Sequence, residues 1–203
     1  MTEWTPSERR ILRKLNTPRK IQDHLDQLTY NCENSAFSPR MVMITNEGHC
    51  FEGGLLAAAA LEFHGMKPLM VDLEAHNDDH HVLAVYQTKT GWGSIAKSNT
   101  ALLRARAPFY QSARELVMSY FDFYFNTKGE LSLTSYALIN LNKYNHWHWR
   151  TTEKDLEKMG MSFWKEKHFK LMTPAHIRKL PKVSKTTLDA CFLGANPDGL
   201  FKA

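Results

Sequence analysis

The chain has 203 residues, of which 43% are hydrophobic and 23% are charged, the composition of an ordinary globular protein. It holds no internal repeat and no low-complexity tract, and its longest apolar run, 53–61, is too short to span a membrane. A chain of this length can bury a substantial core without disulfides or metals, and we expect one domain that does not enter the membrane.

The net charge of +5 is unevenly placed along the chain. Residues 1–20 carry +4, 21–142 carry −5, 143–185 carry +7 and 186–203 carry −1. Basic segments of this kind attract acidic partners or nucleic acid. The simpler interpretation is a solvated helical surface, and we favour it. The alternative is an acidic partner that binds the basic C-terminal segment.

The chain has three cysteines, Cys32, Cys50 and Cys191, with no CxxC spacing. An odd number without metal-type spacing argues for reduced thiols and against a disulfide framework. The first ten residues contain no apolar signal core. We therefore expect a cytoplasmic protein.

The first 45 residues are expected to form N-terminal helices. Thr5-Pro6 and Thr17-Pro18 each combine a capping residue with a proline suited to the first helical position, and apolar residues follow at helical spacing. Residues 31–40 are rich in turn formers, and the short apolar run Met41–Ile44 is interpreted as a strand.

Residues 46–142 are expected to form the central part of the fold. A helix is predicted from Cys50 or Phe51 through Phe63, because Ala57–Ala60 are strong helix formers and Gly65 suits the helix end. Further along, the apolar and β-branched pattern predicts strands at 68–73, 81–87 and 92–97, with a hairpin turn at 88–91, and an aromatic-rich helix at 108–126.

The remaining residues, 143–203, are expected to form a basic, Trp-rich extension with helices near 151–159 and 173–180. Helices come before closely spaced strands in the predicted order. This order favours one α+β domain over 1–203, in which a central helix carrying Cys50 packs on a small antiparallel sheet, with additional helices at both ends.

Cys50 is the first candidate for chemistry. A thiol at a helix start lies near unpaired backbone N–H groups and the positive end of the helix dipole, and both favour the nucleophilic thiolate. The same N–H groups are placed to bind an oxyanion. A free cysteine is otherwise most often a small buried residue, so position alone does not assign a function.

A thiol nucleophile needs a nearby base, which His80 or His81 is placed to supply where a polar turn enters the strand at 81–87. Consecutive side chains on a strand point to opposite faces, so only one of the two histidines is expected to face the helix. We favour His81, because it opens the most regular apolar run.

The segments GHCFEGGLLAAAALEF (48–63), PLMVDLEA (68–75) and DDHHVLAVYQTKTGWGSIAKSN (78–99) resemble the core of the transglutaminase-like superfamily, a branch of the papain-like cysteine enzymes. The resemblance covers 48–99, a quarter of the chain. It implies an α+β fold with a catalytic cysteine at Cys50 and a catalytic histidine at His81. It also implies an acidic residue on the strand after Trp92.

That acidic residue is absent: its expected position falls near Ala96. Asn99, and more weakly Ser98, are the candidates to orient His81 in its place. The backbone N–H of Cys50, with the side chain of Asn46, is the candidate oxyanion site. Glu52, in the first turn of the helix, would oppose thiolate formation if it lay close to the sulfur.

Two histidine-containing segments, 76–81 and 146–149, resemble metal or stacking motifs. Neighbouring residues on a strand diverge, whereas metal ligands must converge on one point, so no metal and no cofactor are expected.

Three functions remain open. The first is a cysteine hydrolase or acyl transferase that acts on a peptide, amide or thioester. The second is an inactive module that keeps the fold and binds a partner through Trp147, Trp149 and Trp164. The third, ranked last, is nucleic-acid binding by the basic, aromatic segment 143–185.

Overall fold

The computed structural model describes residues 4–33 and 35–202. Its centre is a six-stranded sheet in the order β4-β3-β2-β1-β5-β6, with every neighbouring pair antiparallel. The strands are β1 (Leu69–Ala75), β2 (His81–Gln87), β3 (Trp92–Ile95), β4 (Arg106–Tyr110), β5 (Leu133–Asn140) and β6 (Phe169–Lys170). The predicted α+β class with an antiparallel sheet is confirmed.

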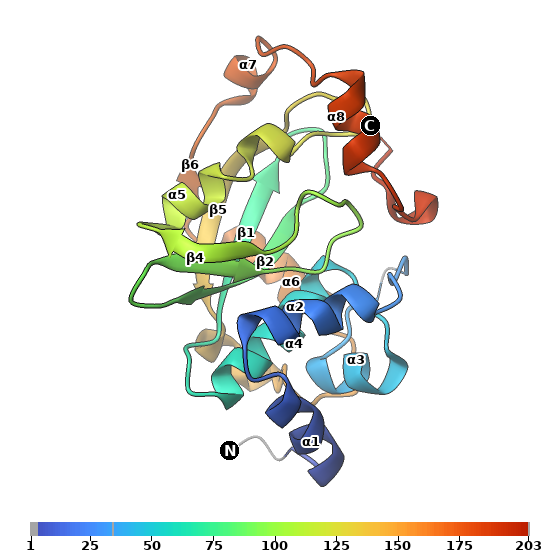
Figure 1. Ribbon diagram of the computed structural model, residues 1–203, viewed down its shortest axis with the longest axis vertical. Helices are drawn as coiled ribbons and strands as arrows, with labels where there is room; N and C mark the ends of the chain where they lie inside the picture. Colours follow the sequence, from blue (N-terminus) through green and yellow to red (C-terminus); the bar gives the residue numbers. More distant parts are fainter. Residues whose placement is uncertain (1–3, 34, 203) are drawn as a thin grey trace.

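The helix α4 (Cys50–Phe63) packs against β2 on one face of the sheet. Every residue from Phe51 to Leu61 is buried, because the helix is apolar on all sides and its small Ala and Gly side chains allow close neighbours. Figure 1 shows it between the sheet and the helices α1 (Pro6–Lys14), α2 (Pro18–Gln27) and α3 (Pro39–Thr45). The predicted central helix is confirmed.

Two hydrophobic cores lie on the two faces of the sheet. The first core surrounds α4 and includes Leu12, Leu25, Val42, Leu56, Met70, Val82, Ala84, Ile139, Leu156, Met159 and Phe163. The second core lies under α5 (Ala113–Met118) and includes Val71, Leu73, Leu83, Val85, Ala96, Leu116, Tyr120, Tyr124 and Leu133. Side chains of β2 alternate between the two cores, as expected of a strand buried on both faces.

The predicted strand at Met41–Ile44 is wrong, because these residues lie in α3. The hydroxyl of Ser38 accepts a hydrogen bond from the backbone N–H of Met41, and Pro39 occupies the first helical position. This local capping outweighs the β character of a four-residue apolar run.

The single helix predicted over 108–126 is also wrong. Residues 106–110 form β4, which pairs with β3 through Trp92–Tyr110 and Ser94–Arg106. The chain then forms α5 and the 3-10 helix η1 (Phe121–Phe123). Tyr120, Phe121 and Tyr124 pack into the second core rather than along one helix, whereas Phe123 is exposed.

Residues of the C-terminal region pack in the first core and against the second. The helix predicted near 151–159 is wrong over most of its length, because α6 (Glu157–Ser162) begins only at Glu157. The helix predicted near 173–180 is the shorter α7 (Pro174–Ile177). The other elements of this region are η2 (Leu141–Trp147), η3 (Phe163–Lys165), α8 (Lys185–Cys191) and η4 (Pro197–Gly199). Among residues 4–33 and 35–202, no helix combines the length and apolar character needed to cross a bilayer.

Candidate functional site

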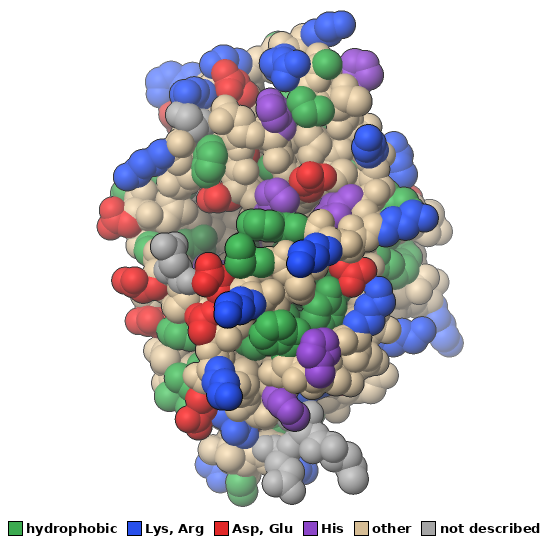
Figure 2. All heavy atoms as spheres, turned by 180° about the vertical axis from the view of Figure 1, so that it is seen from behind, with side chains coloured by type: hydrophobic (Ala, Val, Ile, Leu, Met, Phe, Trp, Pro, Cys, Tyr) green, Lys and Arg blue, Asp and Glu red, His purple; other side chains and the backbone are tan. Residues whose placement is uncertain are grey.

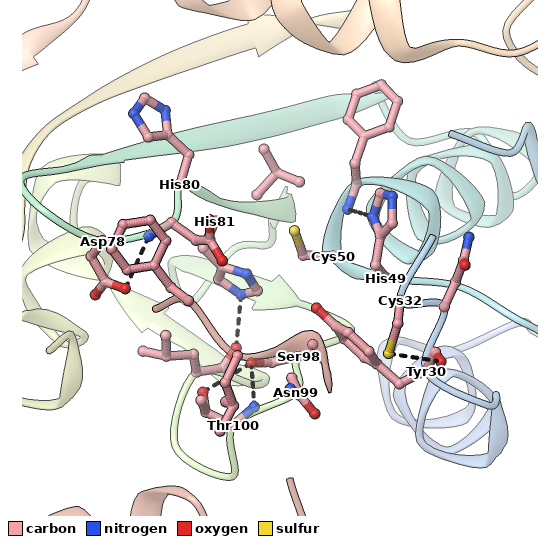
Figure 3. A pocket seen from close by; sticks show the side chains of 18 of the residues that line it. Tyr30, Cys32, His49, Cys50, Asp78, His80, His81, Ser98, Asn99 and Thr100 are labelled. Carbon is pink, nitrogen blue, oxygen red and sulfur yellow. Dashed lines mark hydrogen bonds between the residues drawn. The ribbon is translucent and has the colours of Figure 1, made fainter. Parts of the chain in front are cut away.

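A cavity of about 830 Å³ opens beside the first turn of α4. Its walls come from the loop after α2, the start of β2, the loop after β3, the segment α6–η3 and the C-terminal residues 198–202. Figure 2 shows this face of the molecule, which is hollowed near its centre. Cys50, His81, Ser98 and Asn99 all line the cavity, and Figure 3 shows them with their neighbours.

The sheet leaves room for the first turn of α4 at this point. β3 pairs with β2 only from Ala84 to Gln87, so the first three residues of β2 have no paired residue from β3. The backbone N–H of Val82 lies close enough to Cys50 to favour its thiolate and so lower its pKa. Gly53 allows the segment after β3 to pack closely against this turn, because a Cβ at Gly53 would lie 2.4 Å from Cβ of Lys97.

Cys50 is the first residue of α4, and the turn before it is closed by a capping box. Nδ1 of His49 accepts a hydrogen bond from the N–H of Phe51 at 3.2 Å, and Glu52 accepts one from the N–H of His49 at 2.7 Å. This local pattern fixes the helix start at the sequence position that was predicted.

The thiol of Cys50 is protonated at neutral pH. Burial raises its pKa to about 12, although the nearby backbone N–H groups of Val82 and Phe51 act in the opposite direction. The negative charges of Asp79 and Asp72 raise the pKa further. The thiolate expected from the helix start alone is therefore not the resting state, because desolvation outweighs the helix terminus.

His81 opens β2 and is almost fully buried. Its Nε2 lies 3.0 Å from the carbonyl oxygen of Leu103. A carbonyl oxygen only accepts, so Nε2 carries the ring proton and Nδ1 holds the lone pair. Burial lowers the pKa of His81 to about 4, against the opposing effects of the Leu103 carbonyl and the charge of Asp72.

Cys50 and His81 line the same cavity, but His81 does not reach it from the face of the sheet that was expected. Val82 packs in the first core, beside α4, and Leu83 in the second, so His81 does not lie on the face that α4 covers. The expectation that His81 faces α4 is therefore wrong, although both side chains line the cavity at the gap beside β2 (Figure 3). Within the described residues, no hydrogen bond joins the thiol to the ring, a looseness common in unliganded sites.

Neither candidate for orienting His81 does so. The side chain of Asn99 donates to the carbonyl of Asn196 and accepts from its N–H, both at 2.8 Å. The Ser98 hydroxyl accepts a hydrogen bond from the N–H of Thr100 at 3.1 Å. Both residues line the cavity, but the carbonyl of Leu103 holds the ring instead.

Asn46 does not reach the cavity. It ends α3 in the left-handed conformation, with φ of 58°, and its side chain is exposed. Its carbonyl accepts a hydrogen bond from the N–H of Thr29 at 3.1 Å. The expected contribution of Asn46 to an oxyanion site is therefore wrong, because the turn before Gly48 directs it to solvent.

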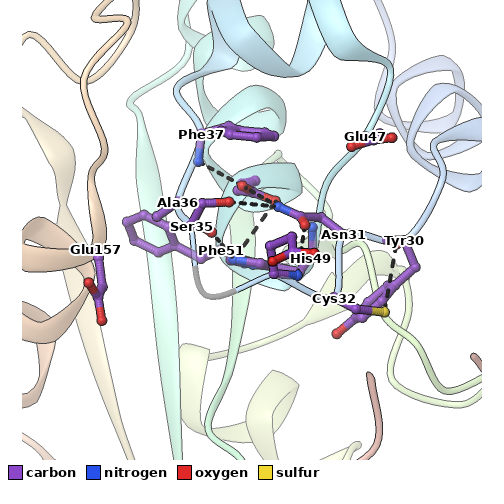
Figure 4. A network of polar contacts seen from close by, with 12 residues as sticks. Tyr30, Asn31, Cys32, Ser35, Ala36, Phe37, Glu47, His49, Phe51 and Glu157 are labelled. Carbon is purple, nitrogen blue, oxygen red and sulfur yellow. Dashed lines mark hydrogen bonds and ion pairs between the residues drawn. The ribbon is translucent and has the colours of Figure 1, made fainter. Parts of the chain in front are cut away.

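Glu52 is buried, and hydrogen bonds hold its carboxylate. It accepts from the N–H of Phe37 at 2.7 Å and from the side chain of Asn31 at 3.1 Å, as well as from the N–H of His49. Figure 4 shows this network, which links Asn31 and Phe37 to the start of α4. Glu52 thus ties the cavity wall to the helix.

Sequence reasoning missed four contributors to this site: Tyr30, Asp72, Asp79 and the carbonyl of Leu103. Asp72 offered a signal, because an acidic residue inside the apolar strand 68–73 is unusual unless it has a partner. It lies buried 3.2 Å from Nε2 of His168 and 3.8 Å from Nδ1 of His80. Leu103 offered none, since a backbone oxygen has no sequence signature.

No protein-family profile matches the sequence, and no curated protein matches it either. The assignment of a function therefore depends on the geometry of the cavity and on the residues that line it.

The predicted metal and tryptophan motifs do not form a site of their own in the described part of the chain. Among residues 4–33 and 35–202, no group of three His, Cys, Asp or Glu side chains converges as a metal site. Trp149 is fully buried in the first core, so it cannot belong to an interaction surface. Trp164 is 57% exposed at the cavity rim, where its ring lies 5.6 Å from that of His80.

Proposed function

We propose that the chain is a cysteine-dependent acyl transferase or hydrolase, similar in mechanism to the transglutaminase-like enzymes. The observation that carries the proposal is the shared cavity. It holds a thiol at the start of a buried helix and a histidine whose tautomer leaves Nδ1 as the basic atom.

In the proposed reaction, the sulfur of Cys50 attacks the carbonyl carbon of an amide or thioester. The thiol proton passes to Nδ1 of His81 as the S–C bond forms. The carbonyl oxygen becomes anionic and accepts a hydrogen bond from the N–H of Cys50. Collapse of this intermediate expels the amine or thiol, which takes the proton from His81. Water or an amine then removes the acyl group from the sulfur.

Because both groups are neutral at rest, His81 acts as a general base during the attack. The proton transfer creates a thiolate and an imidazolium together, and each charge stabilises the other inside the cavity. Asp72 and the Leu103 carbonyl both favour the protonated ring.

Acetylation of Cys50 by p-nitrophenyl acetate tests the proposal. We expect intact-mass spectrometry to show one acetyl group on the wild-type chain and none on Cys50→Ala. His81→Ala should acetylate at least about a hundredfold more slowly, the size of a general-base contribution. The control Cys32→Ala removes an exposed thiol at the cavity rim and should react like the wild type.

One observation favours a second function, an inactive binding module. The position where the resemblance places an acidic residue is held by Ala96, which is fully buried in the second core. An imidazolium without an anionic partner is less stabilised, and the loss of that anion in a serine triad costs about four orders of magnitude in rate. An unreactive Cys50 in the experiment above would support this alternative.

A further inference from the structure

Tyr30 lies in the cavity wall, in the loop between α2 and α3. Figure 3 shows its hydroxyl end pointing toward Cys50 and His81. The C-terminal segment holds the ring in place. A Cβ at Gly199 would lie 2.6 Å from Cε1 of Tyr30 and 3.0 Å from Cδ1, so glycine is needed for this contact.

The hydroxyl of Tyr30 is available as a donor. Within the described part of the chain, no residue forms a hydrogen bond with it. Burial raises its pKa well above the usual value for tyrosine, and the negative charge of Asp79 acts in the same direction. The group therefore keeps its proton at every pH at which the fold is expected to be stable.

An oxyanion formed at Cys50 would be stabilised more by two donors than by one. Oxyanion sites use preorganised donors aimed at the position of the developing charge, and commonly more than one. The N–H of Phe51 is already directed at Nδ1 of His49, and Asn46 points to solvent. This leaves the N–H of Cys50 as the backbone donor at the start of α4, where no intrahelical acceptor exists.

We propose that the hydroxyl of Tyr30 donates a hydrogen bond to the oxyanion that forms when Cys50 attacks a carbonyl group. The inference rests on the proposed function and names a catalytic residue for it. With an aryl ester, the S–C bond forms, the thiol proton moves to His81, and the carbonyl oxygen gains the negative charge. Cleavage of the C–O bond then releases the phenolate. Tyr30 keeps its own proton throughout.

Two reagents separate this role from other effects of the residue. p-Nitrophenyl acetate reacts through an oxyanion. Iodoacetamide alkylates the same sulfur with loss of iodide and forms no oxyanion. Tyr30→Phe keeps the ring against Gly199 and removes only the hydroxyl. Tyr144→Phe is the matched control, because its hydroxyl bonds to Glu166 at 2.8 Å outside the cavity.

We expect Tyr30→Phe to acetylate about a hundredfold more slowly than the wild type, the effect of losing one oxyanion donor, with alkylation changed by less than about threefold. The control should match the wild type with both reagents. Equal losses with both reagents would make Tyr30 a structural residue and overturn the proposal, as would unchanged acetylation. A wild-type Cys50 that takes neither reagent would instead refute the proposed function, and the role of Tyr30 with it.

Discussion

Nε2 of His81 donates a hydrogen bond to the carbonyl oxygen of Leu103 across 3.0 Å. A backbone oxygen thus occupies the place that a side-chain amide or carboxylate takes in a catalytic triad. It fixes the tautomer of the ring, but it carries only a partial charge. The ring is therefore oriented and neutral, as the proposed role of a base that is protonated only when the thiol gives up its proton requires.

The buried ring predicts a specific loss of stability in acid. The pKa of His81 is about 4 in the folded chain and about 6.5 when unfolded, so below neutral pH the unfolded state binds the extra proton. Stability from this residue is complete above about pH 6.5 and falls toward about pH 4, by roughly 2–3 kcal/mol between about pH 7 and about pH 4.5.

Urea unfolding of the wild type and His81→Gln over this pH range measures the effect. The variant keeps a donor for the Leu103 carbonyl and does not titrate. We expect the wild type to lose unfolding free energy relative to His81→Gln as the pH falls. Parallel curves would show that the ring protonates as freely in the folded state as in the unfolded one.

Gly53 and Gly54 form a matched pair within α4. A Cβ at Gly53 would lie 2.4 Å from Cβ of Lys97, close to the backbone, whereas one at Gly54 would meet the flexible end of Met70, with Cε 2.6 Å away. Alanine favours a helix over glycine by about 0.5–1 kcal/mol at either site. We expect Gly53→Ala to destabilise by about 1–3 kcal/mol and Gly54→Ala to be near neutral.

Thermal or urea unfolding of the two glycine variants gives the comparison. A Gly53→Ala protein as stable as Gly54→Ala would mean that the segment at 97–99 moves away from α4 freely. That outcome would contradict the close approach by which the sheet and the helix start form the cavity.

Asn99 is expected to hold the C-terminal segment rather than His81. Its side chain makes two hydrogen bonds to the backbone of Asn196, each contributing about 0.5–1.5 kcal/mol. Asn99→Ala should therefore speed tryptic cleavage at Lys182 and Lys185 by about tenfold, as the segment opens more often. Acetylation of Cys50 should change by less than about threefold, a small fraction of a general-base effect.

Ser98→Ala serves as the control, because among the described residues the Ser98 hydroxyl forms hydrogen bonds only with Thr100. It should leave both the cleavage and the acetylation rates unchanged. If Asn99→Ala instead abolished acetylation without loosening the C-terminal segment, Asn99 would have the orienting role that the sequence suggested.

The elements that the sequence predicted well are those with strong local signals. The run Ala57–Ala60 with a polar start placed α4, and the β-branched and aromatic run placed β2 at His81–Gln87. The aromatic residues at 120–124 led to the wrong prediction of a single helix over 108–126. An apolar run fits a helix and a folded-back loop equally well until its tertiary partners are known.

Within the candidate site, only the side chains at the start of a helix or strand could be predicted from the sequence. Cys50 and His81 could be named from a helix start and a strand start. Tyr30 could not be named, because its position beside Cys50 depends on how the loop after α2 folds back. No local sequence pattern predicts that fold. Ser98 and Asn99 reach the cavity as predicted, but the turn after β3 directs their hydrogen bonds to Thr100 and Asn196.

The pH dependence of Cys50 acetylation in the wild type and His81→Ala tests the central claim most directly. A neutral His81 that removes the thiol proton should give the wild type a nearly constant rate from about pH 6 to about pH 8, since the ring is neutral above about pH 4. In His81→Ala only the free thiolate reacts, so the rate should rise about tenfold per pH unit below the thiol pKa of about 12. Two proteins with the same rates and the same slope would show that the histidine takes no part in the reaction of the thiol.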